Sequence, residues 1–197
     1  MLTATYTLVA LSVEQTSVRV SLQSLQQLLQ NTFAHQSELT PGQVSFACDT
    51  VKRLYESCHW RKLDMFLIPA IRSATNEAGA LLQDLDELGR AAADAVGVLA
   101  IKLGASAVDT AGKVAQFCSA IEAFCSATLR RLELEEQKLF PVARAVISGE
   151  AWFSIANQML AHDAYVQESR PVRPPDNGAD EAGEQARRQR AAAQLAA

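Results

Sequence analysis

The stretch Arg130–Pro141, RRLELEEQKLFP, carries the residues of this chain best suited to chemistry. Read at steps of three and four, one helical seam consists of Cys118, Ile121, Cys125, Thr128, Leu132, Glu135 and Leu139. Because all of them except Glu135 are apolar or small, the pattern predicts a bundle helix with one carboxylate in its core. A buried charge is costly unless it is paired or binds a metal. Arg131, four residues earlier on the same face, is the predicted partner.

A second seam near the N-terminus also contains one polar residue. Its members are Leu11, Gln15, Val18, Leu22, Leu25 and Leu29. The spacing predicts a helix of about twenty residues beginning near Leu11. Gln15 is the one polar member of this seam.

The first of these stretches carries a family resemblance. Glu135-Glu136 followed by Leu139-Phe140-Pro141 resembles the HxxxEExxLFP signature of the hemerythrin-like (HHE cation-binding) family. There, a histidine and a glutamate one turn apart bind one side of a di-iron site; Arg131 stands at the histidine position. The continuation PVARAVISGEAWFSIANQM, which includes Trp152, is similar to the closing segment of that family. The resemblance implies an all-α, up-and-down four-helix bundle of the hemerythrin type, with a short fifth helix.

Other segments match the family's pattern in part. HWRKLDMFLIP repeats the signature, with His59 at the histidine position, Leu63 at the first glutamate position and Asp64 at the second. EQTSVRVSLQSLQQLL looks like the opening helix, which places Gln15 at the first histidine ligand. At the start of the third helix Glu77-Ala78 replaces the family's EH, so Ala78 stands at a ligand position. Two degenerate copies of one motif are expected of a bundle built from two similar helix pairs.

The resemblance thus defines six ligand positions, at Gln15, His59, Leu63, Ala78, Arg131 and Glu135. Only His59 and Glu135 could coordinate a metal as they stand. Asp64, Glu77 and Glu136 are each one residue away from a ligand position, which turns a helical side chain by about 100°.

Three interpretations follow from these positions, and the first is favoured. In a metal-free core, Arg131 supplies the positive charge, His59 and Gln15 complete the hydrogen bonds, and Leu63 and Ala78 fill space. The second is the family's di-iron site. In the third, a single zinc or iron is bound by His59 and Glu135 with Cys58 or Asp64. The chain is accordingly expected to be a non-enzymatic binding or regulatory module without a cofactor, acting on an unknown protein partner. The alternative is a non-haem iron protein that binds or senses oxygen or nitric oxide, or that handles iron.

Helix signals place the remaining elements. The second helix is expected from Pro41 into the early seventies with a kink near Pro69. The third is expected from Asn76, with a seam formed by Ala78, Leu81, Leu85, Leu88, Ala92, Ala95 and Leu99. The fourth is expected to be capped by Asp109 and to end at about Ile147 before Ser148-Gly149. A fifth, from Glu150 to about His162, would pack Trp152, Ile155 and Met159.

Composition sets the outer limits. The chain has 197 residues, 49% of them hydrophobic, and a net charge of −4. These values predict a helical domain over residues 1–167 and a disordered polar tail over residues 168–197, which lacks bulky apolar side chains. They favour neither a nucleic-acid nor a membrane partner, and with no secretory signal the expected location is cytoplasmic. The four cysteines are expected to be unpaired, and Cys118 and Cys125 to pack as small apolar residues.

Overall fold

The structure, a computed structural model, describes residues 2–59, 61–100 and 107–168. Every regular element among these residues is helical and none is a β-strand, which confirms the predicted all-α class. The chain divides into two compact units, Met1–Leu160 and Ala161–Ala197. The first unit contains the features discussed below. Of the predicted tail, only residue 168 is described, and residues 169–197 lie outside the described part of the chain.

The helical elements follow one another with short connections. The α-helices are α1 (Leu2–Asn31), α2 (Pro41–His59), α3 (Ile68–Ala74), α4 (Gly79–Val98), α5 (Ala111–Leu134), α6 (Phe140–Val146) and α7 (Gly149–Glu168). Between them lie a 3-10 turn, η1 (Phe33–His35), and the π turns η2 (Leu63–Leu67) and η4 (Glu135–Leu139). Helix α5, the turn η4 and α6 together form the predicted fourth helix, which ends at Val146 with Ile147 as its C-cap, close to the expected end.

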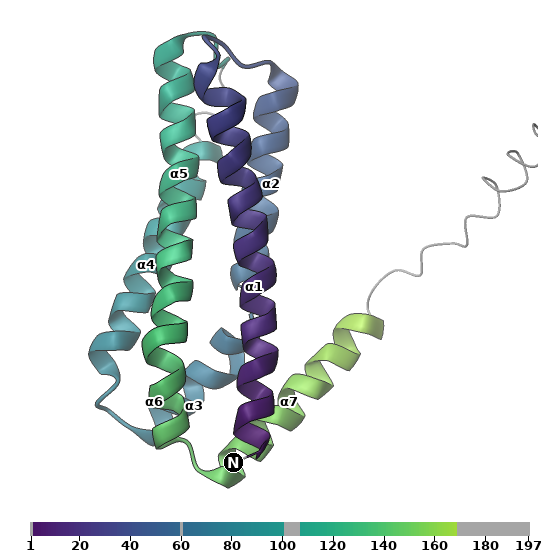
Figure 1. The fold of residues 1–197 in the computed structure, drawn as a ribbon, viewed down its shortest axis with the longest axis vertical. Coiled ribbons are helices and arrows are strands. Elements are labelled where there is room, and N and C mark those ends of the chain that lie inside the picture. The colour runs from purple at the N-terminus through teal and green to yellow at the C-terminus, as the bar shows by residue number, and fades with distance from the viewer. Residues whose placement is uncertain (1, 60, 101–106, 169–197) are drawn as a thin grey trace, which may run out of the picture. The chain divides into compact units, whose positions relative to one another are not determined.

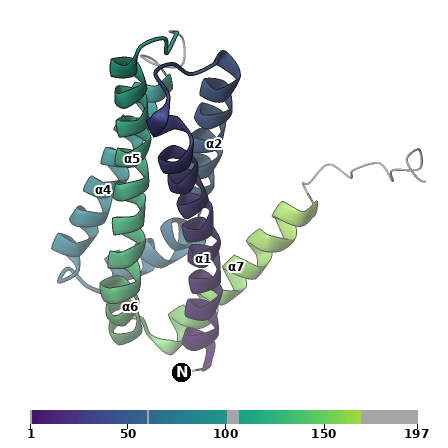
Figure 2. The ribbon, with the colours of Figure 1, turned by 45° about the horizontal axis from the view of Figure 1, so that its top comes forward.

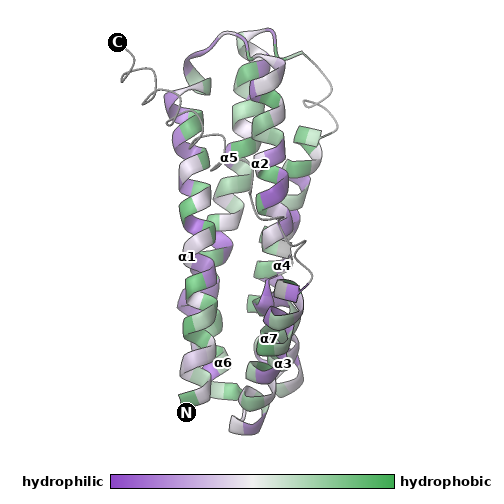
Figure 3. Ribbon diagram, turned by 90° about the vertical axis from the view of Figure 1, so that its right-hand side faces the viewer, coloured by the Kyte–Doolittle hydropathy of each residue, from purple (hydrophilic) through white to green (hydrophobic). Residues whose placement is uncertain are grey.

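Four of these helices lie side by side (Figures 1 and 2). Helix α1 contacts α2 and α5, and α4 contacts the same two helices, so each of the four has two neighbours. Hydrophobic and hydrophilic residues alternate along the helices (Figure 3), as expected when one face of each is buried. No described helix is long and apolar enough to cross a membrane.

The buried apolar residues form two clusters that divide the core along the helix axes. On α1, the second cluster contains Ala4 to Leu11, and the first cluster begins at Val18. Gln15 is buried in the interval between them. On the fourth helix Leu132 belongs to the first cluster and Leu139 to the second, with the buried Glu135 between them. A polar layer therefore separates two apolar halves of the core.

Several helix boundaries differ from the sequence prediction. Helix α1 starts at Leu2, nine residues earlier than predicted, and its predicted seam is buried throughout. The second helix ends at His59 and a new helical segment begins after Arg61, so the expected continuous helix into the early seventies was wrong. Pro69 lies in the first turn of α3, directly after the π turn η2.

The starts of α4 and α5 also differ from the sequence prediction. Thr110, not Asp109, caps α5 by accepting a hydrogen bond from the Lys113 N–H, while Asp109 pairs with the Lys113 ammonium group at 2.7 Å. Helix α4 begins at Gly79, and Leu82 is buried on its core face where Leu81 was predicted.

The expected fifth helix is present as α7. Its predicted anchors Trp152, Ile155 and Met159 are all buried in the second apolar cluster. The helix starts at Gly149 and continues to Glu168, six residues beyond the predicted end at His162.

Candidate functional site

Both copies of the repeated motif fold as a π turn followed by a proline. In the first copy the Ile68 N–H bonds to the Leu63 carbonyl, and in the second the Phe140 N–H bonds to the Glu135 carbonyl, each five residues back. Pro69 and Pro141 come next. Since a proline ring crowds the carbonyl four residues earlier, a widened turn accommodates it without breaking the helix. The first residue of each turn faces the core: Leu63 is 2% exposed and Glu135 is 0% exposed.

Glu135 accepts hydrogen bonds from two other places in the chain and forms an ion pair with a third. Its Oε2 accepts from Gln15 Nε2 at 2.7 Å and from Arg61 Nη1 at 2.8 Å. Its Oε1 accepts from Arg61 Nη2, which makes the Arg61 pairing bidentate. Arg131 Nε lies 3.2 Å from the same Oε1. The predicted Arg131–Glu135 ion pair is therefore confirmed, although Arg61 provides the closer contact.

Asp64 completes the cluster on the side of Arg131. Arg131 Nη2 donates to Asp64 Oδ1, and Arg61 Nη2 lies 3.5 Å from Asp64 Oδ2. We call Gln15, Arg61, Asp64, Arg131 and Glu135 the ion-pair network. It contains two guanidinium groups and two carboxylates, so its formal charge is zero. Such neutrality is what a low-dielectric core requires of buried charges.

The charge states of the network follow from burial and pairing. Burial by itself lowers the pKa of Arg61, but Glu135 and Asp64 outweigh it and raise the pKa above its ordinary value, which keeps the guanidinium charged. Burial raises the pKa of Asp64, and the neighbouring Arg131 and Arg61 oppose this shift without cancelling it. Asp64 is the network's most exposed charged group, with 24% of its side chain accessible.

Arg61 is the functional residue that the sequence interpretation missed. On an unbroken helix it would lie about 200° from Leu63 and so point away from the core. The actual break after His59 reorients it: the Arg61 carbonyl accepts from the Asp64 and Met65 N–H groups and so begins a new helical segment. Its Nε donates to the Cys58 carbonyl at the end of α2 at 3.3 Å. No local signal singled it out, because Lys62 directly beside it carries the same charge.

The other predicted ligand positions lie in different surroundings. Gln15 joins the ion-pair network, while Leu63 and Ala78 are buried in the second apolar cluster. His59 is the last residue of α2, and its side chain lies outside the described part of the structure, so its role stays a prediction.

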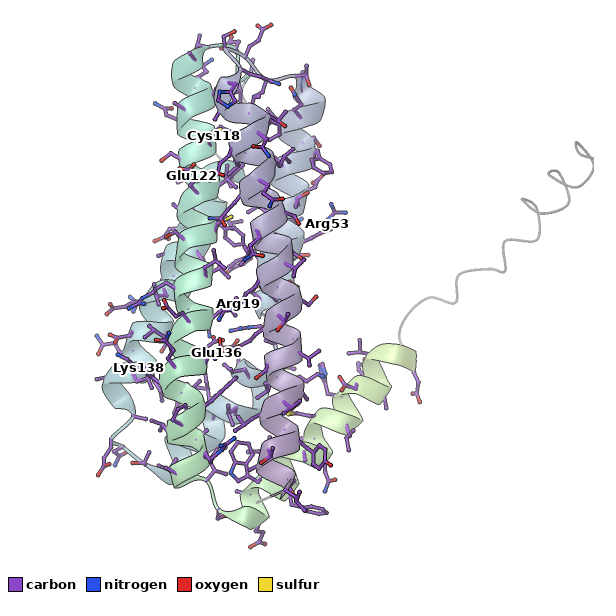
Figure 4. The ribbon with its side chains drawn as sticks, in the orientation of Figure 1. Arg19, Arg53, Cys118, Glu122, Glu136 and Lys138 are labelled. Carbon is purple, nitrogen blue, oxygen red and sulfur yellow. The ribbon has the colours of Figure 1, made fainter. Side chains whose placement is uncertain are left out.

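Asp64 and Glu136 stand at the second glutamate position of the two motif copies, and their surroundings differ. Asp64 enters the ion-pair network, although the sequence placed it one position off the core. Glu136 is exposed and pairs with Arg19 of α1 at 2.8 Å, as the facing side chains in Figure 4 show. Glu77, the third residue one position off, is also exposed.

The described side chains do not fit a pair of metal ions. Both oxygens of Glu135 already accept hydrogen bonds from Arg61, and Leu63 and Ala78 have no coordinating atom. Among the described residues, no group of three or more His, Cys, Asp or Glu side chains is arranged to hold a metal ion. Two guanidinium groups at this place would also repel a cation.

A pocket of about 530 Å³ adjoins the ion-pair network, and we call it the network pocket. Its lining combines charged and apolar groups, among them Arg61, Asp64, Gly89, Arg90, Phe124 and Arg131. Residues from the end of α2, from α4 and from α5 thus meet around it. Its volume falls in the range typical of small-molecule sites.

The cysteines make no described disulfide. All four are free, and Cys118 and Cys125 are buried as predicted. Burial raises the pKa of Cys125 to about 12. Cys58 lines the network pocket, and burial raises its pKa too, with Arg61 opposing. Cys58 is therefore a neutral thiol at neutral pH and a poor nucleophile.

Comparisons of the chain with family models, with curated proteins and with solved structures gave no match.

Proposed function

We propose that this chain is a divergent hemerythrin-like protein, an up-and-down four-helix bundle in which the ion-pair network takes the place of the di-iron centre. It acts as a non-enzymatic binding or regulatory module, and the network pocket is its binding site. The proposal rests on the family resemblance of RRLELEEQKLFP. It is supported by the mutual packing of α1, α2, α4 and α5, and by the π turn that both motif copies share.

One observation carries the metal-free part of this proposal. Glu135, which matches a metal ligand of the family, is fully buried and holds Arg61 through both of its oxygens. Arg131, at a histidine position, adds a second positive charge at 3.2 Å. A metal ion in this place would have to displace two cations from a low-dielectric core. Internal cations thus perform the neutralising role that iron has in the family.

The chemistry of the described site favours binding over catalysis. Glu135 has no solvent exposure and no oxygen free for proton transfer, and Arg61 is held in its charged form. Cys58 lines the network pocket, and its raised pKa keeps it protonated. A general base or nucleophile needs a pKa near the working pH and access to substrate. None of these three groups meets both conditions.

Anaerobic reconstitution with ferrous iron tests the proposal. The protein is loaded, desalted and analysed for metal per chain, and its near-ultraviolet spectrum is recorded after air is admitted. We expect no bound iron and no change in melting temperature with chelator, because a ligand that binds only the native state would stabilise it. The matched variants are Glu135→Gln in the network and Glu136→Gln on the surface.

Two outcomes would contradict the metal-free proposal. Close to two irons per chain with an oxo-bridge absorption band, lost in Glu135→Gln but not in Glu136→Gln, would restore the di-iron interpretation. One zinc or iron per chain, lost in His59→Ala, would establish the single-metal site.

A further inference from the structure

The network pocket carries an uncompensated positive charge. Of its charged lining, Arg61, Asp64 and Arg131 belong to the neutral ion-pair network that includes Glu135. Asp86 also lines the pocket, and it is paired with Arg72 at 3.0 Å. Arg90 is exposed and makes no hydrogen bond or ion pair with any described residue. The balance around the pocket is therefore one positive charge, which suits a monoanion.

A second donor faces the same space. Arg131 donates Nη2 to Asp64, its Nε lies 3.2 Å from Glu135 Oε1, and its Nη1 donates to no described residue. Nη1 lies beside Gly89, where a Cβ atom built on the glycine would meet it at 3.4 Å. The missing side chain of Gly89 thus leaves room in front of this N–H. Arg90, the next residue of α4, is at the same wall of the pocket.

Besides these charged groups, the network pocket has an apolar part of its lining. Phe124 and Leu132 are completely covered, but Leu88 and Ala93 keep part of their apolar surface accessible. A fully hydrated inorganic ion would gain nothing from these groups. An occupant with a hydrocarbon body would bury apolar area against them at about 25 cal/mol per Å².

We propose that the network pocket binds a small amphipathic monoanion, an aliphatic or aromatic carboxylate. Its carboxylate pairs with Arg90 and accepts from Arg131 Nη1, and its apolar body lies against Leu88 and Ala93. This inference rests on the proposed binding function and names the ligand class of that site. The ion-pair network then has a second role, because it fixes the Arg131 guanidinium in the orientation that leaves Nη1 free.

Two-dimensional NMR titration of the full chain tests this ligand class, with benzoate and hexanoate as probes. Benzamide serves as a neutral molecule of the same shape as benzoate. We expect saturable shifts of the Gly89 and Ala93 amides with the two carboxylates and none with benzamide. Arg90→Gln should weaken benzoate binding about tenfold, the usual effect of losing one charge-assisted hydrogen bond. Arg53→Gln, which removes an exposed arginine of α2 (Figure 4), should leave binding unchanged.

A matched pair of glycine variants places the carboxylate within the pocket. Gly89 and Gly97 both lie inside α4, but a Cβ at Gly97 would meet nothing within 4 Å. Gly89→Ala should weaken benzoate binding several-fold because its methyl group occupies the space in front of Arg131 Nη1. Gly97→Ala should bind benzoate as the parent does, and both variants should keep the parent's circular dichroism spectrum.

The inference is overturned if neither carboxylate gives saturable shifts, if benzamide binds as well as benzoate, or if Arg90→Gln binds like the parent. Its failure is separable from that of the metal-free proposal. The measurement of iron per chain decides the metal-free proposal. A chain that contains no iron and binds neither benzoate nor hexanoate would disprove only the ligand class.

Discussion

Leu63 and Glu135 occupy equivalent places in two copies of one local structure, and the protein surrounds them in opposite ways. Each begins a π turn that a proline follows, and each is almost completely buried. Leu63 packs among apolar neighbours in the second cluster, whereas Glu135 is bound by Gln15, Arg61 and Arg131. The shared backbone geometry decides that the position is buried. The side chain then decides what the neighbouring helices must supply.

The difference also explains why the core is divided. A leucine extends an apolar cluster without cost, but a buried carboxylate requires donors on every accessible lone pair. Those donors come from α1 and from the break after α2, Arg131 of α5 adds an ion pair, and together they form a polar layer across the core. Because a half-satisfied network is costly, the members of this layer are expected to depend on one another.

The largest effect is expected from removing the main partner of Glu135. Arg61→Met leaves a carboxylate with 0% exposure short of its bidentate cation and should lower the free energy of unfolding by about 3–5 kcal/mol. Adding Glu135→Leu should recover most of the loss, because the remaining Arg131–Asp64 pair is again neutral. Urea unfolding followed by circular dichroism measures both. A double variant less stable than Arg61→Met would contradict this account.

The matching experiment is made at Leu63, the position equivalent to Glu135 in the first motif copy. Leu63→Ala should cost about 2–5 kcal/mol through lost burial and the cavity left behind. Because no charge is involved, the loss should be the same at low and high salt and from pH 5 to pH 8. A loss below about 0.5 kcal/mol, typical of surface changes, would place Leu63 outside the core.

The two arginines of the ion-pair network should differ in importance. Arg131 is 16% exposed and Arg61 is 3% exposed, and Arg61 retains both bonds to Glu135 when Arg131 is changed. Arg131→Met should therefore cost about 1–2 kcal/mol, near the low end for a hydrogen bond to a charged group. Arg53→Met is the exposed control. Equal losses for Arg61→Met and Arg131→Met in urea unfolding would show that the two cations share Glu135 equally.

The smallest effect concerns the pH dependence contributed by Asp64. Burial raises its pKa above 3.8 although Arg131 and Arg61 oppose the shift, so the folded chain takes up this proton more readily than the unfolded chain. Its contribution to stability is complete below pH 3.8 and is lost as the pH rises through the folded pKa. Asp64→Asn removes this contribution, so parent and variant stabilities should diverge across that window. Parallel pH profiles in urea unfolding would disprove the raised pKa.

The sequence was most informative where periodic pattern and local chemistry agree. The seam of α1, the burial of Glu135, the ion pair with Arg131 and the anchors of α7 were all predicted from spacing. Helical spacing predicts these features because it assigns residues to one face of a helix, independently of the neighbouring helices. The ligand class of the network pocket had no such signal, since Gly89 and Arg90 are ordinary residues of a helix until α5 is placed beside them.

What the sequence by itself determined is which faces of the helices are buried and that one of those faces contains a carboxylate in need of a cation. Only the tertiary structure decided which cation comes closest. Arg61 is 74 positions from Glu135 in the chain, and a helix break that no strong local signal marks turns it toward the core. The same applies to Asp64 and Gln15, whose contacts depend on how separate helices pack. Hydrophobic periodicity assigns residues to faces within one helix. A buried polar network is completed by side chains from several helices, and only the packing of those helices brings the side chains into contact.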